Sequence, residues 1–217
     1  MLRHPDNTNL TIHYADTFQG LPVMADKGPF VSNYLTRLKL TIERSLAQYS
    51  RVLAFRVDLR LPATTQLPDY AYTNEVISLF LESFKAKIKH NREIARKTNQ
   101  YAHDSNVRYV WAREQGQGGR PHYHLVILLN QDAFYTVGKL DSDRVNMFHR
   151  LQEAWASALR LQVHEVSGLV EVPMNATYRL RRDAETYQEL FKRASYLCKT
   201  ATKAFGDGCH GFDTSRV

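Results

Sequence analysis

One stretch decides the fold of this chain: Arg120-Pro121-His122-Tyr123-His124-Leu125-Val126-Ile127-Leu128-Leu129-Asn130. An apolar run that starts after two glycines and ends at Asn130 predicts a β-strand. Side chains on a strand alternate, so His122 and His124 share one face while Tyr123 points into a core on the other. Two imidazoles on one face can share a divalent metal. The same pair also fits an ordinary half-exposed strand, and a His-x-His triplet among nine histidines is common by chance.

Composition bounds the class of protein. A length of 217 residues with 43% hydrophobic and 24% charged residues fits one domain with a sizeable core, preceded by an extension. The formal net charge of +7 favours a polyanionic partner, nucleic acid first. Two cysteines exclude a disulfide framework and a Cys-rich zinc module, and favour a reducing cytoplasm. No signal peptide and no membrane-spanning run is expected, so no membrane partner is predicted.

Periodicity places the elements along the chain. Helices are expected at about 31–48, 74–97, 141–161 and 183–203, the third capped by Asp141-Ser142-Asp143. Strands are expected at about 51–61, 106–114, 120–130, 168–172 and 177–180. The sequence therefore predicts an N-terminal extension and helix over 1–48, a main domain over 49–205 and a flexible tail over 206–217. Residues 1–30 are expected to be loosely structured, because prolines and glycines interrupt them.

Residues 107–130 read as a β-hairpin whose second strand carries the histidines. If Glu114 lies opposite His122, then Ala112 lies opposite His124. Glu114 would add a carboxylate beside the imidazoles, and Ala112 would leave room for an ion. A slip of one residue would send Glu114 to the other face, so this register is a hypothesis.

Basic residues mark possible phosphate contacts. Arg56 and Arg60 lie on the polar face of strand 51–61, where they either meet phosphates or form a solvated ladder with Asp58. A basic face on helix 74–97 is more typical of solvated surface. A basic, aromatic cluster suits nucleic acid and is also common on plain surfaces; it comprises Tyr178, Arg179, Arg181 and Arg182.

The last predicted helix carries a second stripe, which comprises Lys192, Tyr196, Lys199 and Lys203. Tyr196 and Lys199 stand one turn apart on the same face. Tyr196 could attack a phosphorus as a phenolate, with Lys199 and a metal favouring the ionised form. This stripe lies opposite the apolar face of the helix. Either the helix is clamped between the sheet and other elements, or its phase differs from the expected one.

A metal bound by His122, His124 and Glu114 would keep open positions to grip a scissile phosphate and stabilise a leaving 3′ oxygen. Mg²⁺ prefers oxygen ligands, whereas imidazole suits Mn²⁺ or softer ions.

These motifs resemble those of a known superfamily. His122-Tyr123-His124 resembles the His-hydrophobic-His signature of HUH endonucleases, and Tyr196-x-x-Lys199 resembles the motif of their single-tyrosine rolling-circle replication initiators. Glu114 resembles the third metal ligand of viral initiators in its position. More narrowly, 119–125 together with 195–199 resembles the inovirus-type replication protein family of bacterial prophages, with its YagK/YfjJ C-terminal domain. The resemblance covers roughly residues 50–205.

The resemblance implies an α+β fold, ferredoxin-like, with an antiparallel sheet of about five strands and packed helices. It implies nicking of single-stranded DNA at a replication origin, presented in a hairpin, through a 5′-phosphotyrosine that allows rejoining. Tyr196 and Lys199 would be the catalytic residues, and the cofactor would be Mn²⁺ or Mg²⁺. A host helicase would be a partner, and the protein would be located in the bacterial cytoplasm. The residues expected to contact DNA are Arg56, Arg60, Arg120, Arg179, Lys192 and Lys203.

Two other functions stay open at this point. A DNA-binding prophage regulator would keep the fold and the basic surface without cleaving. A hydrolase of another kind would use the metal to activate water and leave Tyr196 a bystander, releasing a free 5′ phosphate. The oligomeric state is not predicted.

Overall fold

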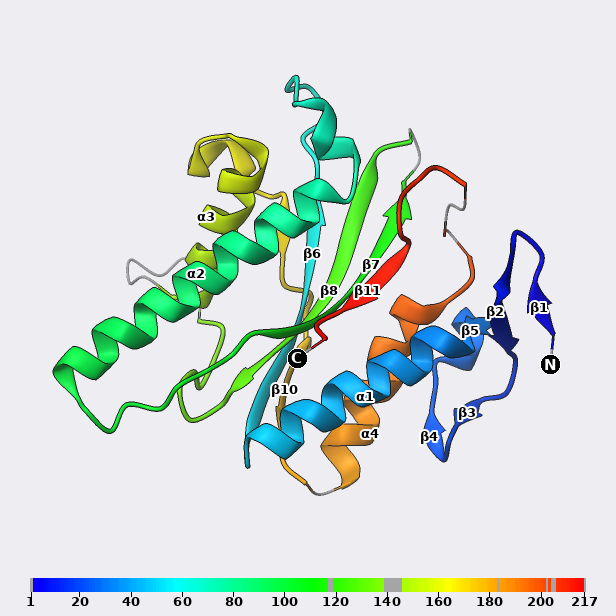
Figure 1. Cartoon of the computed structure of the whole chain (residues 1–217), viewed down its shortest axis with the longest axis horizontal. Coiled ribbons are helices and arrows are strands. Elements are labelled where there is room, and N and C mark those ends of the chain that lie inside the picture. The colour runs from blue at the N-terminus through cyan, green and yellow to red at the C-terminus, as the bar shows by residue number, and fades with distance from the viewer. Residues whose placement is uncertain are drawn as a thin grey trace.

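The computed structural model describes residues 2–116, 119–138, 146–182, 184–201, 203 and 206–216. Helices lie on both faces of a central antiparallel sheet (Figure 1), which confirms the predicted α+β class. The helices are α1 (Ser32–Gln48), α2 (Glu75–Thr98), α3 (Met147–Leu159) and α4 (Ala184–Ala194). The strands of the central sheet are β6 (Val52–Arg60), β7 (Arg108–Gln115), β8 (Pro121–Asn130), β9 (Val170–Glu171), β10 (Thr177–Leu180) and β11 (Phe212–Thr214).

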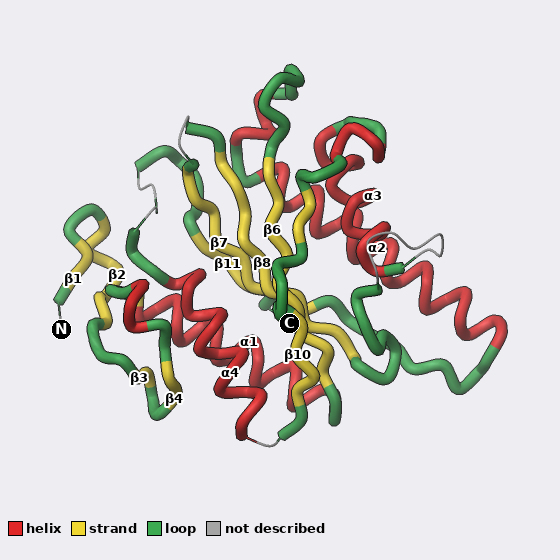
Figure 2. Tube along the Cα trace, turned by 180° about the vertical axis from the view of Figure 1, so that it is seen from behind, coloured by secondary structure: helices red, strands yellow, loops and turns green. Residues whose placement is uncertain are grey.

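Strand β8 lies at the centre of this sheet. The strand order is β10-β6-β8-β7-β11, and the short β9 pairs with the other end of β6. All of these pairings are antiparallel. Every residue of β8 from Tyr123 to Asn130 is buried, because neighbouring strands flank it and helices cover both of its faces (Figure 2).

One face of the sheet packs against α2 and α3. Tyr123 and Leu125 of β8 meet Phe80 of α2 and Trp155 of α3 in this core. Trp155 is fully buried and its indole N–H donates to the backbone oxygen of Arg60 at 2.8 Å. The predicted core face of the histidine strand is therefore confirmed.

The opposite face packs against α1 and α4, and it also carries the histidines. Ala54, Val126 and Leu128 are buried beneath these helices. The strand over 51–61 is buried more deeply than its predicted polar face suggests, because helices cover both of its faces. Asp58 is buried, Arg56 is half-buried and Arg60 is the one exposed residue of β6. On the same face of β6, Ala54 is followed by Arg56 and Asp58. The polar end of the sheet therefore begins directly after the apolar residues of this face.

Residues 1–30 form more regular structure than predicted. They contain the strands β1 (Arg3–His4), β2 (Asn7–His13), β3 (Thr17–Phe18), β4 (Leu21–Pro22) and β5 (Phe30–Val31), and the 3₁₀ turn η1 (Ala25–Lys27). Strands β1, β2 and β5 make a small sheet, and β3 and β4 a hairpin. Phe18, Leu21 and Phe30 are buried in the core beneath α1 and α4. Those scattered apolar residues, which show no periodicity, fix the segment to the domain.

The C-terminal residues also depart from expectation. The predicted flexible tail includes β11, which pairs with β7. The predicted last helix ends at Ala194 and is followed by the 3₁₀ turn η4 (Ser195–Cys198). Helix α3 has Asn146 as its N-cap, whereas the predicted cap at 141–143 lies outside the described residues. Among the described helices, none is both long and apolar enough to span a bilayer.

Candidate active site

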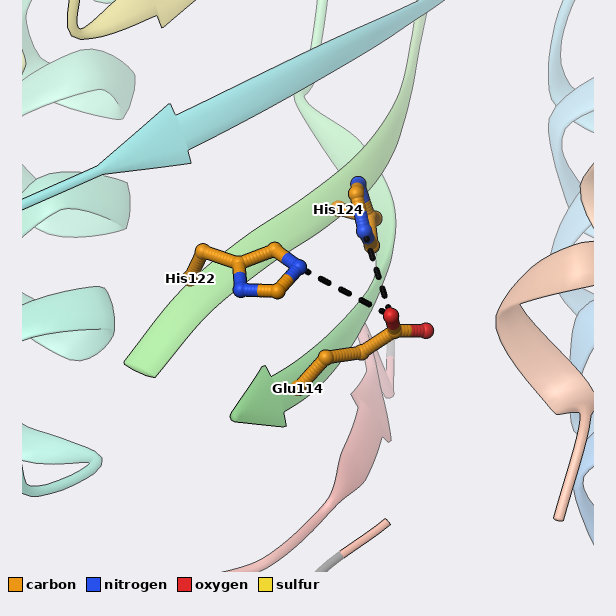
Figure 3. Close-up of side chains that lie close together, drawn as sticks. All are labelled: Glu114, His122 and His124. Carbon is orange, nitrogen blue, oxygen red and sulfur yellow. Dashed lines mark ion pairs between the residues drawn. The ribbon is translucent and has the colours of Figure 1, made fainter. Parts of the chain in front are cut away.

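Two histidines and one glutamate converge at the polar end of the sheet. The register pairs Glu114 with His122 and Ala112 with His124, which confirms the predicted alignment of the hairpin. Glu114 Oε2 lies 3.7 Å from His122 Nε2 and 3.5 Å from His124 Nε2 (Figure 3). One ligand atom from each residue lies within 4.8 Å of the other two. Two imidazole nitrogens and a carboxylate oxygen fit a transition-metal ion with open positions.

Charge around Glu114 keeps its carboxylate ionised. Burial raises the pKa of Glu114, but the neighbouring imidazoles of His122 and His124 outweigh burial and hold that pKa well below its usual range. The side chain of Glu114 is only 3% exposed. A metal ligand must be deprotonated, so this environment prepares the carboxylate for a cation.

Asp58 orients one of the imidazoles. Strand β6 pairs Asp58 with His124, and Asp58 Oδ1 lies 2.8 Å from His124 Nδ1. Asp58 also accepts two hydrogen bonds from Arg56, at 2.8 and 2.9 Å. Burial lowers the pKa of His124, but the carboxylates of Asp58 and Glu114 outweigh it and raise that pKa. A carboxylate on Nδ1 leaves Nε2 as the nitrogen that faces Glu114, the usual support of a metal-binding histidine.

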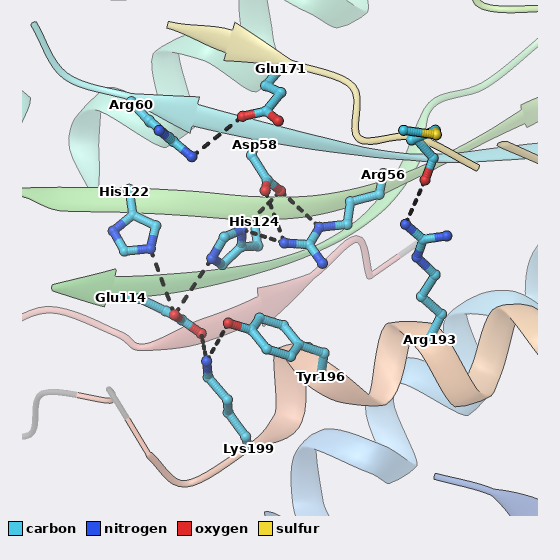
Figure 4. A network of polar contacts seen from close by, with 11 residues as sticks. Arg56, Asp58, Arg60, Glu114, His122, His124, Glu171, Arg193, Tyr196 and Lys199 are labelled. Atoms are coloured by element: carbon cyan, nitrogen blue, oxygen red, sulfur yellow. Dashed lines mark hydrogen bonds and ion pairs between the residues drawn. The ribbon is translucent and has the colours of Figure 1, made fainter. Parts of the chain in front are cut away.

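Tyr196 and Lys199 lie against this cluster although some 80 residues separate them from it in sequence. Lys199 Nζ lies 2.5 Å from Tyr196 Oη and 3.1 Å from Glu114 Oε1 (Figure 4). The rings of Tyr196 and His124 make a T-shaped contact with centroids 5.6 Å apart. The structure thus brings the predicted catalytic pair and the predicted metal ligands into one network.

The 3₁₀ turn η4 sets the direction of Tyr196. A 3₁₀ helix has three residues per turn, so it rotates side chains away from the phase of the preceding α-helix. The predicted single stripe from Lys192 to Lys203 is therefore wrong as an α-helical face. Tyr196 instead packs partly buried against the core beneath α1 and α4, with its hydroxyl toward Lys199. This change of helix type resolves the mismatch in the predicted phase.

The N-terminal segment clamps that turn at both ends. The backbone N–H of Met24 donates to Ser195 Oγ at 3.0 Å. The backbone N–H of Thr200 donates to the oxygen of Pro29 at 2.9 Å, and Phe30 forms a β-bridge with Lys199. Residues 24–30 are thus part of the support of Tyr196, a role that no sequence pattern indicated.

The remaining predicted DNA contacts have different surroundings. Arg60 pairs with Glu171 at 3.3 Å, and Arg120 donates to the backbone oxygen of Pro62. Lys203 points inward, where burial lowers its pKa to about 8 while the Glu114 carboxylate opposes that change. The other three residues line one cleft beside Tyr196; they are Arg56, Arg179 and Lys192.

Sequence reasoning missed the role of Asp58. It placed Asp58 on the polar face of its strand but only as a surface partner of Arg56. Alternation gave the correct face, yet the contact with His124 depends on β6 lying next to β8. That order of strands is a tertiary property, and the local pattern does not carry it.

Comparison with known proteins gives a family and one distant structural match. Residues 13–215 match the model of the family described as YagK/YfjJ C-terminal domain. Two Escherichia coli (strain K12) proteins, both named as uncharacterized, are similar: YfjJ is 34% identical over 87% of this chain and 96% of its own length, and YagK is 31% identical over 93% and 98%.

One solved structure also matches, the N-terminal nuclease domain of minute virus of mice non-structural protein-1. That structure is described with Zn²⁺ coordination in its active-site pocket and DNA recognition at the origin of replication. The match has 13% identity and a TM-score of 0.25, and it covers 84% of this chain and 77% of that domain. At that TM-score the structural match carries no argument, so the site is judged on its own residues.

Proposed function

This chain belongs to the YagK/YfjJ C-terminal domain family, and from its site we propose that it is a metal-dependent single-stranded DNA endonuclease of the HUH type. Tyr196 is the nucleophile, Lys199 assists it, and Glu114, His122 and His124 hold the cation. The substrate is one strand at the replication origin of a phage or prophage element, exposed in a hairpin and nicked to start rolling-circle replication.

One observation carries this proposal. The ammonium of Lys199 lies 2.5 Å from the hydroxyl of Tyr196 and 3.1 Å from the Glu114 carboxylate, which faces two imidazoles. A nucleophile beside a group that stabilises its anion is the usual signature of covalent catalysis. A purely structural tyrosine would not need a buried lysine shared with a metal-binding carboxylate.

The chemical step conserves the number of phosphodiester bonds. Tyr196 Oη loses its proton to water and forms a bond to the scissile phosphorus. The bond from phosphorus to the 3′ oxygen breaks, and that oxygen takes a proton to become a 3′ hydroxyl. The 5′ side stays on Tyr196 as a phosphotyrosine, so attack by a 3′ hydroxyl can reverse the step and rejoin strands.

Residues of this chain prepare each part of the step. Lys199 donates a hydrogen bond to Tyr196 Oη, which favours the phenolate. Asp58 holds His124, and Glu114 is kept ionised by its neighbours. When bound, a divalent cation would polarise the phosphate and stabilise the charge on the leaving oxygen. Two nitrogen ligands in the set favour Mn²⁺ over Mg²⁺.

The test is a denaturing gel. Purified protein is mixed with Mn²⁺ and hairpin-bearing single-stranded DNAs from the neighbouring genome. We expect a slow protein–DNA band that survives denaturation, disappears in Tyr196→Phe and in His122→Ala, and persists in Tyr101→Phe, whose ring is 80% exposed. Cleavage with a free 5′ phosphate would support a water-activating hydrolase instead. DNA binding without cleavage at a demonstrated origin would support a regulator. Unwinding by a host helicase is a separate proposal, tested by adding the helicase to a duplex origin.

A further inference from the structure

A cleft of about 1250 Å³ opens beside Tyr196. Helix α4, strand β10 and the N-terminal turn η1 surround it. The side chains that matter here are Lys27, Arg56, Arg179, Lys192, Arg193 and Tyr196. We propose that this cleft binds the unpaired nucleotides next to the phosphate that Tyr196 attacks. The inference rests on the proposed nicking function and adds to it the site that holds the strand.

The charge of the cleft favours a polyanion. Among the described residues that line it, five are cationic and Glu189 alone is acidic. Arg193 donates to the backbone oxygens of Asn175 and Met174 at 2.6 and 2.8 Å, so it holds that segment against α4 at the side of the cleft. Lys192 is exposed on the last turn of α4, where its ammonium can reach a phosphate. Successive cations along a groove are the electrostatic footprint of a nucleic-acid backbone.

Flat groups in and beside the cleft favour unpaired bases over a duplex. Tyr178 and Tyr196 both line the cleft. The guanidinium of Arg179 lies 4.0 Å from the centroid of the Tyr135 ring, and that ring is 64% exposed. Aromatic and guanidinium planes stack on bases whose faces are free, which a duplex does not offer. The cleft volume also exceeds the ~300–1,000 Å³ of ordinary small-molecule sites.

The position of the cleft fits a strand that passes Tyr196. In Figure 4, His122 and Glu114 lie on one side of Tyr196, whereas Arg56 and Arg193 lie on the other. Arg56 joins the two regions, because it lines the cleft and also bonds to Asp58. Its guanidinium lies 5.1 Å from the centroid of the Tyr196 ring. A phosphate at Tyr196 Oη would therefore have its neighbouring nucleotides within reach of Lys192 and Arg179.

The test measures binding, which does not require cleavage. Fluorescent poly-dT is titrated without metal into the full chain and into Lys192→Ala, Arg179→Ala and Lys97→Ala, the last being an exposed lysine at the end of α2. We expect the two cleft variants to bind several-fold more weakly, each with a salt slope smaller by ~0.7, the value for one phosphate contact on a single strand. We expect Lys97→Ala to bind like the unchanged protein. Since Lys192 is exposed, its replacement leaves the fold intact.

The outcomes separate this inference from the proposed function. Equal binding by all variants, or equal losses in all, would overturn the cleft as the strand site. An equal loss on a duplex of the same length would overturn its preference for unpaired bases. A tyrosine adduct in the unchanged protein together with unaffected binding by both cleft variants would remove the cleft and leave the nicking function standing. Weakened binding by the cleft variants without any adduct at a demonstrated origin would remove the nicking function and leave the cleft standing as a site for single-stranded DNA.

Discussion

Asp58 Oδ1 lies 2.8 Å from His124 Nδ1, across the two adjacent strands β6 and β8. The other ring nitrogen of His124 faces Glu114 Oε2 at 3.5 Å. One imidazole thus connects a carboxylate that sets its orientation to the carboxylate with which it would share a bound metal. Because Asp58 is 7% exposed and anchored by Arg56, this contact is a fixed part of the site.

The first prediction concerns metal affinity. Asp58→Asn keeps the volume of the side chain but removes the charge that orients His124. We expect affinity for Mn²⁺ to fall about 10- to 100-fold, the usual effect of losing such support. Isothermal titration measures it, and Asp69→Asn, at an exposed aspartate that begins the 3₁₀ turn Asp69–Tyr72, is the matched control. Unchanged affinity in Asp58→Asn would mean that packing alone holds His124.

The second prediction concerns the rate of adduct formation. Lys199→Ala removes the hydrogen bond to Tyr196 Oη and the positive charge beside Glu114. We expect the rate to fall by about 10²–10³, as when one preorganised donor is lost at a reacting oxygen. Lys199→Arg should recover part of the rate, because it keeps the charge. Single-turnover kinetics measure the rate, and a binding titration measures the affinity for DNA. An equal fall of rate and affinity in Lys199→Ala would contradict the role of Lys199 in the reaction.

The third prediction concerns the support of η4, the turn that carries Tyr196. Ser195 is fully buried; its hydroxyl accepts from Met24 N and donates to the oxygen of Lys192 at 2.6 Å. We expect Ser195→Ala to lower the free energy of unfolding by about 1–3 kcal/mol, because polar groups lose their partner, and to slow adduct formation at the neighbouring Tyr196. Urea denaturation measures the first effect. Ser78→Ala, at an exposed site on α2, should change stability by less than about 0.5 kcal/mol.

The fourth prediction concerns acid stability. Arg113 is 6% exposed and donates to Asp207 Oδ2 at 2.6 Å. Burial raises the pKa of Asp207, but the hydrogen bond from Arg113 outweighs it and lowers that pKa below its usual value. A lowered folded-state pKa gives stability that is present at neutral pH and lost as the pH falls through that pKa.

Asp207→Asn should therefore destabilise the protein at pH 7 and flatten the acid side of its stability curve. Unfolding midpoints measured at several pH values below 5 test this, with Asp69→Asn again as the control. A curve as steep as that of the unchanged protein would show that other carboxylates dominate the acid loss of stability.

Parts of this fold and site could be predicted because they follow from local rules. Alternation along β8 gave the face of His122 and His124, and hairpin geometry then gave the partner of Glu114. The apolar stripe of α2 predicted both ends of that helix to within a residue or two. These features depend on residues close together in sequence.

Other parts could not, because they depend on contacts between distant segments. The strands of residues 1–30 are mostly two residues long, too short for any period, and buried anchors such as Phe30 fix them. The change from α4 to a 3₁₀ turn at Ser195 occurs where the N-terminal segment bonds to it. Asp58 gains its role only because β6 and β8 are neighbours.

The clamp on η4, the turn that carries Tyr196, has a consequence for synthesis of the protein. Its contacts join Met24 to Ser195 and Pro29 to Thr200, each pair 171 residues apart. A ribosome makes the first partner of each pair long before the second, so the support of Tyr196 can close only after Ser195 and Thr200 have emerged. A nascent chain that already carries both histidines would still lack Tyr196, and a chimera that exchanges the first thirty residues for those of a relative would have to preserve this late closure to hold Tyr196 beside them.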